Sequence, residues 1–133
     1  MPAFNFQQRF VPGVENGLAR IAHAPPVHRD VRQKRQTIRA RRKDGRDPKP
    51  GDTLKLFTGM RTKQCVKLGE TRCRTRQEIQ IDIDGLATVD GERLSLGKLA
   101  ALRRRDGLPE SWEFRSFFQR IHGLPFEGYV YRW

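Results

Sequence analysis

Cationic and hydroxyl side chains alternate along one short segment near residue 40, and this pattern is suited to contacting a polyanion. In an extended strand over 35–41, side chains two residues apart point to the same face. One face of this strand then offers three cations and a hydroxyl, while the other packs on a core. The polar face is formed by Arg35, Thr37, Arg39 and Arg41, and the other by Gln36, Ile38 and Ala40.

A basic loop follows this strand directly. Residues 42–50 contain Arg42, Lys43 and several Gly, Pro and Asp residues but no apolar side chain, which indicates an exposed loop. A turn at Gly51 leads into a second strand over 53–57, where two leucines alternate with other residues. The region 34–57 therefore predicts two strands joined by a cationic loop.

The composition favours a polyanionic partner. The chain has 133 residues, enough for a single domain, with 27 Lys and Arg against 15 Asp and Glu, a formal charge of +12 and a pI near 10.8. Nucleic acid is the first candidate. An anionic membrane is discounted, because the arginines do not line a long amphipathic helix. There is neither a long apolar segment nor a secretory signal, so we expect a cytoplasmic protein.

The N-terminal third predicts a strand, a short helix and an irregular insertion. Residues 3–6 have a strand pattern, and Phe10 and Val14 have helical spacing in a helix that Gly17 is placed to stop. Residues 18–33 show neither helical nor strand periodicity, which indicates a long irregular loop or a mobile flap. We expect no metal site there, and we expect Cys65 and Cys73 to be reduced thiols.

The rest of the chain predicts further strands and two helices. We expect strands over 79–83 and 128–133, a hairpin turn at Asp90-Gly91, and helices over 96–105 and from 111 to Gly123. Three arginines at positions 72, 74 and 76 are spaced two residues apart, so in a strand they would lie on one face. That face would be either a cationic stripe that binds a ligand or an ordinary solvated surface. The element order predicts an α+β fold, a small, partly closed β-barrel with flanking helices.

An ordered series of short motifs resembles the ASCH domain family, a branch of the PUA-like barrels. The likeness spans nearly the whole chain apart from 18–33 and is greatest to the small stand-alone members of bacteria and their phages. The motifs are Phe6-Gln7-Gln8-Arg9-Phe10, Lys34-x-x-Thr37-x-Arg39, Pro50-Gly51-Asp52, Asp106-Gly107-Leu108 and Gly128-Tyr129-Val130.

This resemblance implies one PUA-like domain over 1–133 with a cleft for RNA or a modified nucleoside, and no cofactor. Some small members remove the acetyl group from N4-acetylcytidine with a Lys, a Thr and an acidic residue, which correspond to Lys34, Thr37 and Asp106. Arg39 corresponds to a cleft arginine. The chain departs from the pattern in its long insertion before Lys34 and in an Asp where the amidohydrolases have Glu.

Amide hydrolysis by this set requires Thr37 as nucleophile and Lys34 as its base, with Asp106 positioning the lysine or shuttling a proton. Neighbouring arginines would favour the neutral amine of Lys34, because like charges disfavour the ammonium form. Lys34 is out of phase with Thr37 and Arg39, so it would approach from the turn before the strand.

Three functional hypotheses remain open. The first is nucleic-acid binding, with RNA as the expected ligand. The second is hydrolysis of a modified nucleoside or of RNA, and the third is an inhibitory role through a protein partner. The residues expected to contact nucleic acid are Arg9, Arg35, Arg39, Arg41, Arg42 and Lys43.

Overall fold

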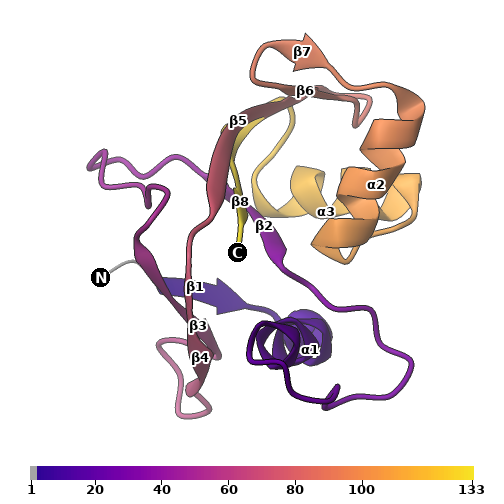
Figure 1. Ribbon diagram of the computed structural model, residues 1–133. Helices are drawn as coiled ribbons and strands as arrows, with labels where there is room; N and C mark the ends of the chain where they lie inside the picture. The colour runs from indigo at the N-terminus through magenta and orange to yellow at the C-terminus, as the bar shows by residue number, and fades with distance from the viewer. Residues whose placement is uncertain (1–2) are drawn as a thin grey trace. The chain divides into compact units, whose positions relative to one another are not determined.

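The computed structural model describes residues 3–133 and shows a mixed α+β chain with two β-sheets and three α-helices (Figure 1). The chain divides into two compact units, each assembled from segments distant in sequence. The first unit comprises the chain up to Arg35, Pro48–Arg74 and Trp133, and the second comprises Gln36–Asp47 and Thr75–Arg132. Each unit contains one of the sheets. In the described part of the chain the strands form these two open sheets, and no closed barrel is found.

The first unit is a three-stranded sheet with one helix. The sheet order is β1-β3-β4, with β1 parallel and β4 antiparallel to β3, and Leu54 and Leu56 of β3 are fully buried. The strands confirm the predicted alternation at 3–6 and 53–57. The elements are β1 (Ala3–Phe6), the short 3-10 helix η1 (Gln8–Phe10), α1 (Val11–Ile21), β3 (Thr53–Thr58) and β4 (Val66–Arg72).

Helix α1 exists as predicted but is longer, because Gly17 does not stop it. The helix continues to Ile21, so only the residues after it are irregular. Gly13 and Gly17 lie one turn apart, where the returning chain packs against the helix backbone. A Cβ at Gly13 would lie 3.1 Å from the Arg32 carbonyl oxygen, and one at Gly17 would collide with the carbonyl oxygen of Lys34. The glycine permits close approach instead of ending the helix.

The second unit is a five-stranded antiparallel sheet with two helices. The order is β2-β8-β5-β6-β7, and α2 packs against β2 and α3. The predicted strand near residue 38 and the Asp90-Gly91 hairpin are confirmed; both turn residues have positive φ, 50° and 81°, as a two-residue hairpin requires. The elements are β2 (Gln36–Ala40), β5 (Thr75–Ile81), β6 (Ala87–Val89), β7 (Glu92–Arg93), α2 (Leu96–Asp106), α3 (Ser111–Ile121) and β8 (Phe126–Arg132).

Both helices of the second unit start near their predicted residues. The Ser95 hydroxyl accepts the Lys98 N–H at 3.3 Å and caps α2, and α2 ends at Gly107, which has φ 88°. Phe114 and Phe118 of α3 are buried in the core. Leu96, at the first turn of α2, is 77% exposed and takes no part in the core.

Two strand predictions are corrected. The cationic stripe at 72, 74 and 76 does not form, because β4 ends at Arg72 and β5 begins at Thr75. Between them Cys73 is buried, with its N–H donating to the Asp52 carbonyl at 2.8 Å. The strand over 79–83 ends at Ile81, because the Asp82 carboxylate accepts the N–H groups of residues 84 and 86 and forms a turn.

Candidate functional site

A polar cluster in the second unit brings together three of the predicted site residues. Thr37 and Arg39 share a face of β2, and the Arg39 Nε donates to the Thr37 hydroxyl oxygen at 3.0 Å. Asp106, at the last residue of α2, lies beside the same strand, because Gln36 Nε2 donates to its Oδ1 at 3.4 Å. Thr37, Gln36 and Asp106 are all buried. Asp106 therefore lies beside β2, where its charge acts on the Arg39 guanidinium.

Arg39 is the group in this cluster whose pKa departs most clearly from its usual value. Burial lowers the pKa of its guanidinium to about 10; Asp106 opposes this decrease and Arg42 adds to it. Burial and the Arg39 charge also lower the pKa of His122, which directly follows α3 and whose ring centre lies 4.8 Å from that of Phe126. A partly desolvated guanidinium held in a fixed plane by Thr37 interacts strongly with an anion or a carbonyl oxygen.

Gln36 connects β2 by hydrogen bonds to α2 and to β8. Its Nε2 also donates to the Leu102 carbonyl at 3.1 Å, and its Oε1 accepts Arg132 Nε at 3.1 Å. Arg132 Nη1 in turn donates to Gln77 Oε1 at 2.7 Å. Sequence reasoning missed Gln36 and Arg132. The available signal was a glutamine on the core-facing side of β2, because a buried amide needs hydrogen-bond partners.

Lys34 belongs to the first unit, where its position is determined by α1. Its N–H donates to the Gly13 carbonyl at 2.7 Å, and its side chain is buried. The Nζ lies 5.0 Å from the centre of the Phe10 ring and 5.9 Å from that of Phe6. Two aromatic faces stabilise an ammonium, so this environment suits a charged lysine.

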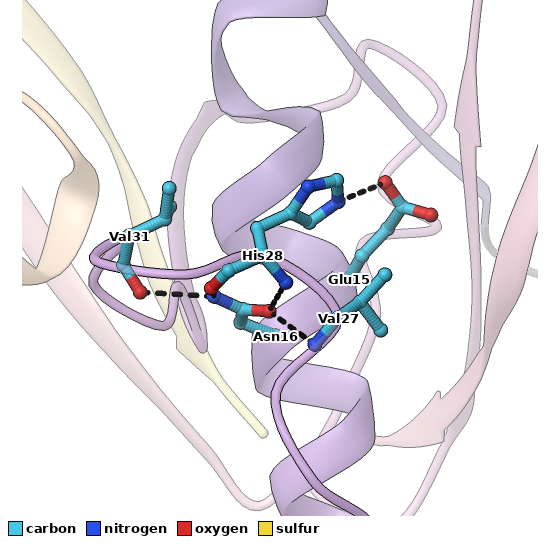
Figure 2. A network of polar contacts seen from close by, with 5 residues as sticks. All are labelled: Glu15, Asn16, Val27, His28 and Val31. Atoms are coloured by element: carbon cyan, nitrogen blue, oxygen red, sulfur yellow. Dashed lines mark hydrogen bonds and ion pairs between the residues drawn. The ribbon is translucent and has the colours of Figure 1, made fainter.

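The segment before Lys34 is an ordered loop tied to α1 by Asn16 (Figure 2). The Asn16 Oδ1 accepts the N–H groups of Val27 and His28, and its Nδ2 donates to the carbonyls of His28 and Val31, all four at 2.9 Å. His28 Nε2 also lies 2.9 Å from a Glu15 carboxylate oxygen. All four hydrogen-bonding positions of the amide are used, so the loop returns the chain to α1 at a fixed place.

The remaining predicted cations are divided between the units. In the first, Arg9 lies 5.1 Å from the Phe10 ring centre and Arg35 Nε donates to the Trp133 carbonyl at 2.8 Å. In the second, Arg41 forms ion pairs with two glutamates at 3.3 and 3.1 Å, so its charge is already balanced. Arg42 and Lys43 lie in the exposed loop after β2.

The excess positive charge is concentrated in the first unit. That unit holds 13 Lys and Arg against 4 Asp and Glu, or +9, whereas the second holds 14 against 11, or +3. Within the first unit, residues 53–74, which we call the basic hairpin, form β3, β4 and their turn. Its only acid is Glu70, which pairs with Lys67. Its cations are Lys55, Arg61, Lys63, Lys67, Arg72 and Arg74.

No group of three or more His, Cys, Asp or Glu residues suited to a metal ion occurs within residues 3–133. Cys65 is exposed and Cys73 is buried, and no disulfide joins them. None of the helices described is long and apolar enough to cross a membrane.

Comparison with known proteins gives no relative. No family model, no curated protein and no solved structure matches this chain.

Proposed function

We propose that this chain binds RNA, with the basic hairpin as its main contact surface. The observation that carries this proposal is the charge of that hairpin, six cations against one acid. Five of the six cations are exposed, and Lys55 is half-buried. Four carboxylates cannot neutralise the 13 cations of the first unit, so an external polyanion is the natural counterion.

The hairpin also offers an aromatic surface. Phe57 is half-buried and lies on the same side of β3 as Thr53 and Lys55, because side chains alternate along a strand. Arg72 is paired in register with Thr53, which places another cation on that side of the sheet. Cations that contact phosphates beside an aromatic ring that stacks a base are the usual means of holding single-stranded RNA. Cytoplasmic RNA is the ligand that we propose.

Fluorescence anisotropy with a labelled single-stranded RNA tests this proposal. The double variant Arg61→Gln, Lys63→Gln removes two charges from the turn of the hairpin, and we expect it to weaken binding about tenfold or more at low salt. The matched control is Arg104→Gln, Arg120→Gln, which removes two charges from exposed positions on α2 and α3. Equal losses for the two variants would contradict a specific role for the hairpin.

A second candidate function is hydrolysis of an acylated nucleoside. The observation that favours it is the set Thr37, Arg39 and Asp106, in which Arg39 hydrogen-bonds the Thr37 hydroxyl and the Asp106 carboxylate is near enough to act on the Arg39 charge. In this mechanism the Thr37 oxygen attacks the acyl carbon and Arg39 stabilises the oxyanion that forms. The C–N bond then breaks, the hydroxyl proton passes to the departing cytidine amine, and water hydrolyses the acyl-threonine to release acetate. Incubation with N4-acetylcytidine tests it: wild type should release acetate and Thr37→Ala should not. The absence of turnover by wild type removes this candidate.

We also propose that the chain is a divergent ASCH-type protein with a PUA-like barrel. The order of its short motifs along the chain supports this, as does the local grouping of Thr37, Arg39 and Asp106. Long-range backbone NOEs test the barrel directly. A partly closed barrel predicts NOEs between strands of the two sheets in addition to the pairings within each sheet, and NOEs confined to the pairings within each sheet would contradict it.

A further inference from the structure

A second cationic site lies in the second unit, apart from the predicted site residues. A cavity of about 390 Å³ is lined by residues of α2 and of the strands β5 to β8. Its wall contains three cations, Lys98, Arg105 and Arg132, and one acid, Glu92. Apolar side chains such as Leu102 complete the lining. Its volume is that of a small-molecule pocket.

The three cations of this pocket differ from others in the same unit. Arg41 and Arg93 form ion pairs with carboxylates. Within residues 3–133, Lys98, Arg105 and Arg132 form no ion pair, although Glu92 lines the same cavity. The pocket therefore has a local excess of positive charge.

Arg132 is fixed in position by two side-chain amides. Its Nε donates to Gln36 and its Nη1 to Gln77, at 3.1 and 2.7 Å. Burial lowers its pKa, and the charge of Arg105 lowers it further. Placing a second guanidinium beside a half-buried one is unfavourable unless an anion lies between them. Such an arrangement is typical of a preorganised phosphate site.

We propose that this pocket binds the phosphate group of a phosphate monoester about the size of a mononucleotide. Arg105, Arg132 and Lys98 contact the phosphate oxygens, and the apolar wall packs against the remainder of the ligand. The inference does not depend on RNA binding by the basic hairpin.

Isothermal titration and ¹⁵N NMR with three probes test it: cytidine monophosphate, inorganic phosphate and cytidine. We expect the monophosphate to bind saturably and to shift signals near Lys98 and Arg105, and cytidine to give no shift. Inorganic phosphate that binds as tightly as the monophosphate would overturn the monoester part of the proposal, because the apolar wall would then contribute nothing.

Charge variants supply the specificity control. Arg105→Gln should weaken monophosphate binding about tenfold, as loss of one charge-assisted contact does. Arg104→Gln, the adjacent exposed residue on the same helix, should leave it unchanged. Glu92→Gln should strengthen binding, whereas Glu110→Gln, whose side chain makes no capping bond at the start of α3, should not.

The hairpin variant Arg61→Gln, Lys63→Gln should bind the monophosphate like wild type, which separates this site from the RNA proposal. Absence of saturable binding by the folded wild-type protein, or equal losses for Arg104→Gln and Arg105→Gln, would overturn the inference.

Discussion

Replacing Asn16 by Ala should loosen the loop that leads to Lys34 and destabilise the first unit. The substitution removes four hydrogen bonds at once and leaves four backbone groups of the loop, at Val27, His28 and Val31, without their partner. Each such bond contributes about 0.5–1.5 kcal/mol net, so the expected loss for four bonds is about 2–6 kcal/mol. Urea unfolding followed by circular dichroism measures it.

Hydrogen exchange locates the same effect. In Asn16→Ala the amides of Val27 and His28 should lose protection, whereas Asn16→Asp retains the acceptor oxygen and should preserve part of it. Asn5→Ala is the control, because Asn5 is an exposed asparagine whose side-chain oxygen accepts the Met60 N–H at 3.0 Å, and its cost should be below about 1 kcal/mol. Asn16→Ala with unchanged stability and unchanged protection would refute the proposed anchoring of the loop.

Further predictions concern α1 and α3. Gly17→Ala should cost about 1–3 kcal/mol, because its Cβ collides with the Lys34 carbonyl, whereas Gly97→Ala in α2, with open space around it, should be neutral or stabilising by up to about 1 kcal/mol in thermal unfolding. His122 should titrate below 6.5 by NMR, and Arg39→Gln should raise its pKa. Since a lowered pKa means that the unfolded chain binds the proton first, stability should fall as pH decreases through 6.5, and His122→Phe should reduce that dependence.

Sequence patterns predicted which helices and strands form better than they predicted the residues at which these elements end. Alternation located the strands at residues 3–6 and 53–57, since local side-chain periodicity depends only on which face is buried. The predicted helix end at Gly17 was wrong, because the sequence does not distinguish a glycine that ends a helix from one that lets another segment pack against the helix backbone. Alternation also failed at residues 72–76, where a buried Cys73 separates β4 from β5.

The candidate site was predictable only in part. The motif predicts that Thr37, Arg39 and Asp106 form one site. In the second unit Arg39 donates to Thr37, and the charge of Asp106 acts on Arg39. Gln36 and Arg132 were not identified, because their partners lie far away in sequence and no local pattern marks them. The concentration of charge in the first unit also could not be foreseen, since each unit is assembled from separate segments.

The central claim is most directly tested by the salt dependence of RNA binding. For wild type, the logarithm of the affinity for single-stranded RNA should fall linearly with the logarithm of salt concentration, by about 0.7 for each phosphate that the protein neutralises. The slope for Arg61→Gln, Lys63→Gln should be shallower by about 1.4, because this variant neutralises two fewer phosphates. A flat response in wild type, or an unchanged slope in the variant, would contradict RNA binding through the basic hairpin.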